Sequence, residues 1–460
     1  MKKHQLILGS TVLFSVLFYK EEAGVNVLFF AIALLLLIFV TFKNRTGIFK
    51  ILVATSLLSA IAFTWYGDFI SFLALFLSLV FLQFQNQEVK LKIIQSIPLM
   101  YLNFFTSLGR PFLFSQWLPK TKIGNDGVKK AIAYVLIPLV FLGMFFIAYS
   151  FGSDTFSSLF DYELDIDMWD FILIALLGFY VSFSFWNYWI PESFIKINAK
   201  LDNDFSEDSK LNAQPSFSFL DLEFERKSGE ISLVLLNLML LIFIISYNYE
   251  QFFKEVTINP VLLSNATHDR VNAVIISSVM AVGLILFYFK KGFNFDSKAN
   301  FLKLLAKIWV GLNAVLIISS VIKNSEYILH FGMTYKRIGV FAFLGMTLIG
   351  LIFTFFKIRN QKTNMYLFNQ MIWFLYGLIL ICSFVNWGNI ITTYNISVNK
   401  GVDPMFLSRL NYNDTARRDY LLVHKLDGQF PEIDREQEIK SYKSRNFLSK
   451  VGYYEWLSEK

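Results

Sequence analysis

Residues 25–42 read VNVLFFAIALLLLIFVTF, a run of 18 residues without a charged side chain. A helix needs about 20 predominantly apolar residues to cross the hydrocarbon core of a bilayer. Each large apolar residue favours insertion by about 0.3–0.6 kcal/mol, whereas one central arginine opposes it by about 2.5–3.5 kcal/mol. The run therefore predicts a transmembrane helix. Ten similar stretches bring the predicted spans to eleven, at approximately 5–19, 25–42, 48–65, 69–85, 131–151, 168–190, 231–249, 273–289, 306–322, 338–356 and 369–387.

The composition of the whole chain agrees with this interpretation. Hydrophobic residues make up 55% of the 460 residues and charged residues 17%, against about 25% charged in an average soluble domain. A water-soluble fold cannot bury that much apolar surface, which excludes a soluble enzyme with a membrane anchor and a disordered protein. The single cysteine, Cys382, excludes a disulfide-built secreted domain. We therefore predict an all-α, polytopic transmembrane helical bundle.

The distribution of Lys and Arg predicts the orientation of these spans. With the N-terminus in the cytoplasm, the inside segments hold 25 Lys and Arg, the outside loops hold 6 and the tail after Trp387 holds 11. This asymmetry follows the positive-inside rule, and it explains the net charge of +7 without a nucleic-acid partner. Low Ala with much Lys, Asn, Ile and Phe is typical of an AT-rich bacterial genome. We expect a multi-pass protein of the bacterial cytoplasmic (inner) membrane with an extracytoplasmic tail.

One apolar stretch, 93–118, is interrupted by Pro98, Arg110 and Pro111. If residues 93–109 crossed the membrane, every later loop would change sides, and the split outside the tail would become 12 Lys and Arg inside against 19 outside. We therefore expect an interfacial or re-entrant segment here. Arg110 is then either an anchor at the interface or a binding residue.

The end of the last apolar stretch divides the chain into a transmembrane domain, 1–387, and a soluble helical tail, 388–460. Two long loops, 86–130 and 191–230, are expected on the cytoplasmic side. The lipid bilayer is one expected partner, and an envelope protein bound through the tail is the other.

The tail contains local signals for three helices. Asp403-Pro404 combines an N-cap residue with proline at the first helical position. A second helix is expected to begin near Asp414 and to end near Gly428, and a third to begin near Pro431.

Signatures of catalysis are missing from the sequence. It contains no G-x-x-x-x-G-K-[ST], no H-E-x-x-H and no G-x-S-x-G pattern. No metal or cofactor is indicated, and a non-enzymatic role is favoured. Ionisable residues inside the spans, which mark functional sites by default, are scarce, and Asp170 and Lys307 lie near span ends. Amides within spans more often join helices than bind substrates; they are Asn187, Asn237, Asn313 and Asn386.

The segment between the ninth and tenth spans, 323–337, has the composition of an extracellular turn. It contains Tyr327 and His330, followed by Gly332, Thr334 and Arg337. An arginine at the start of a helix is unfavourable for the helix dipole. We therefore expect a partner for its guanidinium: a carboxylate, a cluster of carbonyls or a lipid phosphate. A topological anchor at the interface is the alternative to a binding role.

Several short motifs follow one another over about 150 residues. In chain order they are Asn265–Ala273 around His268, an apolar helix around Asn313, Tyr327 with Gly332-Met333-Thr334 and Arg337, then Tyr394-Asn395-Ile396 and the pair Val402-Asp403. This order resembles that of bacterial polytopic membrane proteins of the domain-of-unknown-function family 4173, which is related to family 4153.

The resemblance implies a polytopic membrane protein, and it brings no established activity with it. The chain departs from the family's Asn-Pro-Asp pattern, because the segment Asn386–Asn389 lacks both Pro and Asp. The residues that the motifs and the outer turn single out are Tyr327, His330, Gly332, Thr334, Arg337, His268, Asn313 and Asn395.

Three functions stay open on the sequence. The first, and favoured, is a non-enzymatic envelope or sensory component whose tail binds a partner outside. The second is a transporter or flippase for a lipid-linked or amphipathic solute. The third is a membrane glycosyl- or acyl-transferase of the polymerase type, for which Arg337, His330 and His268 would be the candidate residues.

Overall fold

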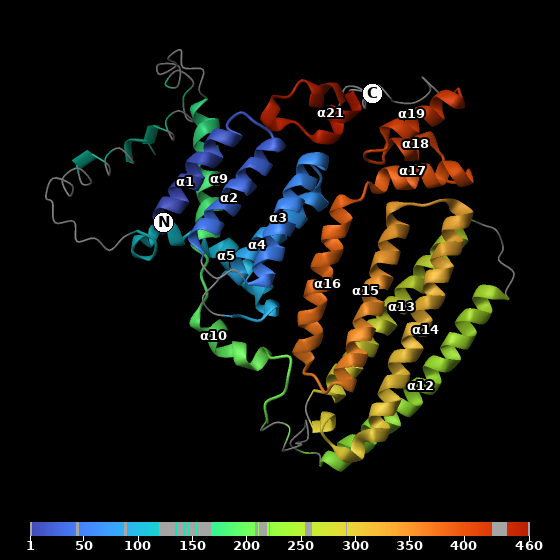
Figure 1. Ribbon diagram of the computed structural model, residues 1–460. Coiled ribbons are helices and arrows are strands. Elements are labelled where there is room, and N and C mark those ends of the chain that lie inside the picture. Colours follow the sequence, from blue (N-terminus) through green and yellow to red (C-terminus); the bar gives the residue numbers. More distant parts are fainter. Residues whose placement is uncertain are drawn as a thin grey trace.

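The computed structural model describes residues 2–42, 46–86, 90–118, 167–207, 221–253, 260–290 and 292–425, residues 439–458, and isolated residues at 210, 219 and between 134 and 156. The side chains of 252, 260–271, 292 and 458 lie outside that description. Within these ranges the elements are helices, and no strand occurs. The predicted all-α helical bundle is therefore confirmed (Figure 1).

The first half of the chain forms an N-terminal bundle. It consists of α1 (Lys3–Phe18), α2 (Val25–Thr41), α3 (Gly47–Tyr66), α4 (Phe69–Gln85) and α9 (Met168–Trp186). Helix α1 packs on α9 and α2, and α3 packs on α2 and α4. Large apolar side chains fill the space between them, among them Ile7, Leu34, Phe49, Leu82 and Phe183.

The segment after α4 does not continue as a spanning helix. A single turn leads into α5 (Ser96–Thr106), which has 11 residues, and two further turns follow at Arg110–Phe112 and Phe114–Gln116. An 11-residue helix is only about 17 Å long, well short of a bilayer's hydrocarbon core. The interfacial or re-entrant position of this segment stays a prediction.

The second half forms a C-terminal bundle built around one long helix. Helix α14 (Asn300–Phe331) packs on α12 (Leu222–Phe252), α13 (Pro260–Tyr288) and α15 (Tyr335–Arg359). The apolar core includes Leu233, Ala281, Ile285, Leu302, Ala306 and Leu316.

Helix α16 (Asn364–Phe384) joins the two bundles, because it packs on α15 on one side and on α4 and α3 on the other. Its Tyr376 hydroxyl lies 2.8 Å from the Ser78 hydroxyl and 2.7 Å from the Thr55 hydroxyl. Hydrogen bonds of this kind commonly fasten helices inside a membrane.

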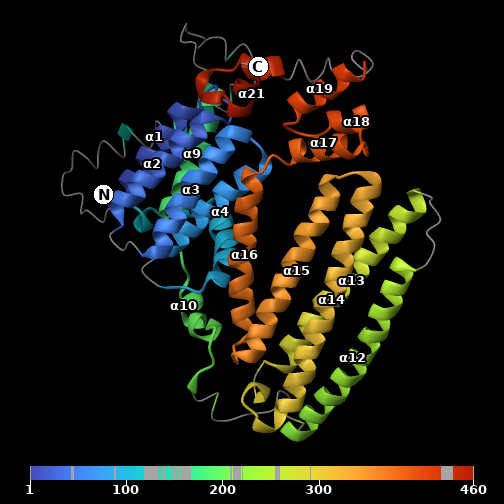
Figure 2. The same ribbon diagram turned by 45° about the vertical axis from the view of Figure 1, so that its right-hand side comes forward.

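The described part of the tail includes α17 (Trp387–Val398), α18 (Pro404–Ser408), α19 (Asp414–Val423), a single turn at Phe447–Ser449 and α21 (Gly452–Ser458). Figure 2 shows α17, α18 and α19 over the ends of the C-terminal bundle and α21 over the N-terminal bundle. The Asp403 carboxylate accepts from Met405 N at 2.8 Å, as expected of an N-cap. Helix α19 ends at Val423, five residues before the predicted end, and Pro431 lies outside the described residues.

Ten of the eleven predicted spans coincide with helices, and the remaining stretch, 131–151, lies largely outside the described residues. Six helices are long and apolar enough to cross a membrane: α3, α9, α12, α14, α15 and α16. The apolar helices α1, α2, α4 and the 272–288 part of α13 are shorter.

Two helices extend beyond the predicted spans because charged residues at their ends are paired. Helix α12 begins at Leu222, inside the predicted loop 191–230, where Arg226 pairs with Asp296 at 2.8 Å. Helix α14 continues past residue 322 to Phe331, and Lys323 pairs with Glu326 at 2.9 Å. Tyr327 and His330 therefore lie in a helix rather than in a turn.

Different segments of the chain meet at the two ends of the bundle. Loops 20–24, 66–68 and 332–334 lie beside the tail, and we name this the tail end (Figure 1). The connectors 90–95 and 198–204 meet the turn between α15 and α16 at the opposite end.

Candidate functional site

The turn between α14 and α15 is built on local backbone chemistry. Gly332 has φ +82°, a left-handed conformation that glycine adopts without a steric penalty. Thr334 caps α15, because its hydroxyl oxygen accepts from Arg337 N at 3.3 Å. The turn thus folds the Gly-x-Thr part of the motif back toward the end of α14.

The Arg337 guanidinium finds its partners within the same motif. One of its nitrogens donates to the Gly332 carbonyl, and its central carbon lies 4.1 Å from the centre of the Tyr327 ring. A guanidinium over an aromatic face is attracted by the ring's quadrupole. Of the three kinds of partner expected from the sequence, a carbonyl is therefore the one observed, supplemented by an aromatic ring.

Asn395 of α17 fastens the tail to this turn. Its side chain is fully buried, and its Oδ1 accepts from Met333 N at 2.6 Å. Its Nδ2 donates to the Met333 carbonyl at 3.1 Å and to the Gly401 carbonyl at 3.2 Å. One amide therefore satisfies three backbone groups from two separate segments. We name Tyr327, Gly332, Thr334, Arg337 and Asn395 the joint.

The other candidate residues do not enter the joint. His330 is exposed, with its ring 6.4 Å from the Phe331 ring. Asn313 is fully buried 18 residues before Phe331, about 27 Å along the helix, and its Nδ2 donates to the Trp309 carbonyl at 2.9 Å. The side chain of His268 lies outside the described residues.

Further tail contacts were not identified from the sequence. The Tyr412 hydroxyl donates to the Tyr66 carbonyl at 2.6 Å, and Asn411 N donates to the Tyr335 hydroxyl at 3.2 Å. Burial raises the pKa of Tyr412 well above its ordinary value, with the nearby Asp68 charge acting in the same direction, so this phenol stays a donor. Ser449 also bonds to Glu21, which ties the last part of the tail to the α1–α2 connection.

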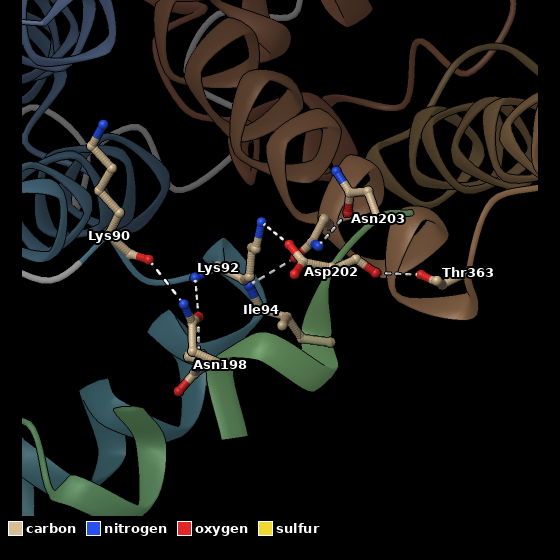
Figure 3. Close-up of polar contacts among 9 residues, drawn as sticks. Lys90, Lys92, Ile94, Asn198, Asp202, Asn203 and Thr363 are labelled. Carbon is tan, nitrogen blue, oxygen red and sulfur yellow. Dashed lines mark hydrogen bonds and ion pairs between the residues drawn. The ribbon is translucent and has the colours of Figure 1, made fainter. Parts of the chain in front are cut away.

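A second polar assembly, which we name the crossing network, lies at the opposite end (Figure 3). Asn198 Oδ1 accepts from Lys92 N and from Gln95 Nε2, both at 2.9 Å, and its Nδ2 donates to the Lys90 carbonyl at 3.0 Å. The Lys92 ammonium pairs with the Asp202 carboxylate. These contacts bind the connector after α4 to the segment after α10 (Glu192–Asn198).

The crossing network continues into α16. Asn369 Oδ1 accepts from Ile94 N at 3.1 Å, and its Nδ2 donates to Asn203 Oδ1 at 2.7 Å. Thr363 donates through its hydroxyl to the Asp202 carbonyl at 2.6 Å. The network therefore fastens the N-terminal bundle to the helix that joins the two halves of the protein.

Replacing Asn369 by leucine is expected to lower the free energy of unfolding by about 1–3 kcal/mol, because it leaves the partly buried Ile94 N–H without an acceptor. Denaturant unfolding of the purified protein in detergent measures this loss. Asn360→Leu is the matched control, since Asn360 is exposed and its side chain makes no hydrogen bond to a described residue. Equal stability of the two variants would contradict a structural role for Asn369.

A buried arginine lies close to this end of the N-terminal bundle. Arg110 is 7% exposed; it donates to Asn103 Oδ1 at 2.9 Å and to the Asn187 carbonyl. Its guanidinium carbon lies 5.7 Å from the Phe183 ring centre and 5.6 Å from that of Trp189. Burial lowers the pKa of Arg110. Among the described residues its partners are neutral, so we interpret Arg110 as a structural residue whose hydrogen bonds hold the interrupted segment 93–118 in place.

Metal-ligating residues do not cluster in the part of the chain that is described, where no group of three or more His, Cys, Asp or Glu residues gathers. The groups that meet in these assemblies are mainly amides, hydroxyls, carbonyls and aromatic rings. Such groups form hydrogen bonds and ring contacts, and in the joint these contacts hold the tail on the spanning helices.

Comparison with protein families matches residues 8–419 to the family described as Domain of unknown function (DUF4153). Comparisons with curated proteins and with solved structures gave no match. The matching family is the relative of family 4173, rather than family 4173 itself, to which the order of the motifs pointed. Because the match extends over most of the chain, the protein belongs to the family described as Domain of unknown function (DUF4153).

Proposed function

We propose that this protein is a non-enzymatic envelope component of the bacterial cytoplasmic membrane. In this proposal the N-terminus is cytoplasmic and the tail is extracytoplasmic, where it binds an envelope partner. The spanning helices then hold the tail and respond when the partner binds to it.

The distribution of charge supports this orientation. The loops at the tail end carry few Lys and Arg, whereas the segments at the opposite end carry most of those outside the tail. Lys and Arg are retained on the cytoplasmic side of bacterial membrane proteins. The tail end is therefore the side that we assign to the outside.

The joint is the observation that carries the proposal. Arg337, one of the three candidate residues of a transferase, donates to the Gly332 carbonyl within the chain, whereas His330 is exposed. Asn395 fastens the tail to the α14–α15 turn, while Tyr412 bonds to the end of α3. A partner bound to the tail would therefore act on both bundles at once.

Cysteine labelling of intact cells tests this orientation. In a Cys382→Ala background, Lys443→Cys places a thiol at an exposed tail position and Asn360→Cys places one at the opposite end. A membrane-impermeant thiol reagent is expected to label residue 443 in intact cells and residue 360 only after lysis. The reverse pattern would place the tail in the cytoplasm and overturn the proposal.

A second candidate, transport or flipping of a lipid-linked solute, is favoured by one feature. A groove of about 560 Å³ between α12 and α13 is lined mainly by apolar side chains, among them Leu240, Phe243, Met280 and Trp309 of α14. Such a groove inside a membrane suits a lipid chain. Deletion of the gene would then change the cell's lipid or envelope-polysaccharide profile, whereas an unchanged profile would remove this candidate.

A further inference from the structure

We propose that the tail holds a binding site for a neutral saccharide, in the cavity between α17, α19 and α21. The cavity has a volume of about 320 Å³. This lies at the lower end of the range of about 300–1,000 Å³ for small-molecule pockets, so it suits a ligand of one or two sugar rings. We name it the tail cavity.

The polar groups that line the tail cavity match a polyhydroxylated ligand. Asn389 and Thr393 come from α17, and Thr415 and Asp419 from α19. The Thr415 hydroxyl is buried without a hydrogen-bond partner among the described residues, and a buried hydroxyl requires one. The Asn389 amide supplies both donors and acceptors, the hydroxyls can do either, and the Asp419 carboxylate accepts. Sugar hydroxyls need this alternation of donors and acceptors.

The charge of the residues that line the tail cavity disfavours an anionic ligand. Asp419 is the one charged residue among the described residues that line the tail cavity, and no Lys or Arg belongs to that set. A phosphate or carboxylate would therefore meet repulsion without a compensating cation. A neutral ligand avoids that repulsion.

Aromatic rings form one wall of the tail cavity. The Tyr453 and Trp456 ring centres lie 5.9 Å apart, and those of Tyr412 and Tyr453 lie 5.0 Å apart in an edge-on arrangement. Trp456 is 36% exposed. The accessible part of a tryptophan ring offers a flat apolar surface on which the C–H face of a sugar ring can lie.

The position of the tail cavity links it to both bundles. The Tyr412 ring packs at a tilt against the Tyr66 ring of α3 with ring centres 5.0 Å apart, and the Asn386 amide at the start of α17 donates to the Tyr412 carbonyl at 2.9 Å. Helix α21 rests on the N-terminal bundle, whereas α19 belongs to the group above the C-terminal bundle (Figure 2). A saccharide between α19 and α21 would hold the two groups together.

The supply of such a ligand rests on the proposed function, because envelope saccharides are available only if the tail is outside. Binding itself does not depend on sidedness. It is tested by titration calorimetry on the full-length protein, purified in a detergent without a sugar headgroup. The probes are glucose, galactose, mannose, N-acetylglucosamine and their disaccharides, with choline and glucose 6-phosphate for comparison.

At least one neutral saccharide is expected to bind with a Kd of about 1 mM or tighter. Ala416→Leu, which fills the tail cavity without removing a polar group, and Trp456→Ala should each weaken binding by about tenfold or more. Two tail variants outside the lining, Arg418→Gln and Phe447→Ala, should stay within about twofold of the parent. Thermal unfolding of each variant separates loss of binding from loss of fold.

The proposal is overturned if no neutral saccharide binds the folded parent protein, or if choline or glucose 6-phosphate binds in its place. It is also overturned if Ala416→Leu retains the parent's affinity. None of these results would alter the labelling pattern of residues 443 and 360. Failure of the saccharide site is thus distinguishable from failure of the proposed orientation.

Discussion

Gly388→Ala is expected to displace α17 from the rest of the tail and to destabilise it by about 3 kcal/mol, the upper part of the range for overpacking. A Cβ atom at this position would lie 1.8 Å from the Asn411 carbonyl oxygen and 3.0 Å from the Tyr335 hydroxyl. The nearest atom belongs to the backbone and cannot rotate away. The helix must therefore shift by more than about 1 Å to restore a van der Waals contact.

Tail protection and thermal unfolding in detergent both report this displacement. The variant should show faster trypsin cleavage after Arg409 and a lower unfolding midpoint than the parent. Gly377→Ala is the control, because a Cβ there has no heavy atom within 4 Å and alanine favours the helix by about 0.5–1 kcal/mol. A Gly388→Ala variant that unfolds with the parent would show that α17 is not packed against residue 411.

The spans were predictable because a helix that crosses a bilayer needs a long run of apolar residues, and such runs are visible in the sequence. An uncharged run such as 25–42 has few alternatives to a helix, and α2 occupies it almost to the residue. The ends of helices were less predictable, because an apolar stretch ends at the first charged residues of the sequence, whereas the helix can continue through them. Lys323 and Arg226 lie inside α14 and α12 because Glu326 and Asp296 pair with them.

The joint was predictable in part. Its contacts between residues close in sequence could be predicted, and its contacts between residues far apart in sequence could not. The Thr334 cap and the contact of Arg337 with Gly332 and Tyr327 involve neighbours within ten residues, so the motif contained both partners. The Asn395–Met333 contact spans 62 residues, and the Tyr412–Tyr66 bond spans 346. No local pattern reports such pairs, because their partners meet only after the helices have assembled.

The tail cavity illustrates the same limit. Its lining comes from three helices, from the N-cap residue Asn386 and from Tyr412 in the loop before α19, and no spacing along the chain relates Asn389 to Asp419. The joint and the crossing network brace opposite ends of the bundle, and both use asparagine side chains as bridges between backbone segments. An amide suits this task because it carries donors and an acceptor on one rigid group.

Asn395→Leu is expected to release the tail from the spanning helices while the bundle itself stays folded. Leucine has a similar size but cannot bond to Met333 N or to the Met333 and Gly401 carbonyls. Each buried backbone group left unpaired costs about 1–3 kcal/mol, so we expect the docking of the tail to weaken by about 2–4 kcal/mol. Faster trypsin cleavage after Lys400, whose carbonyl lies against Gly332, would report the release.

The control is Asn411→Leu, an exposed asparagine of the tail whose side chain makes no hydrogen bond to a described residue. It should leave cleavage after Lys400 unchanged, and both variants should elute from size-exclusion chromatography as the parent does. If Asn395→Leu also collapses the elution profile, the amide supports the whole bundle and not the tail alone. If cleavage stays at the parent's rate, the tail is held by Tyr412, Ser449 and their partners, and the joint is not the element that couples the tail to the membrane helices.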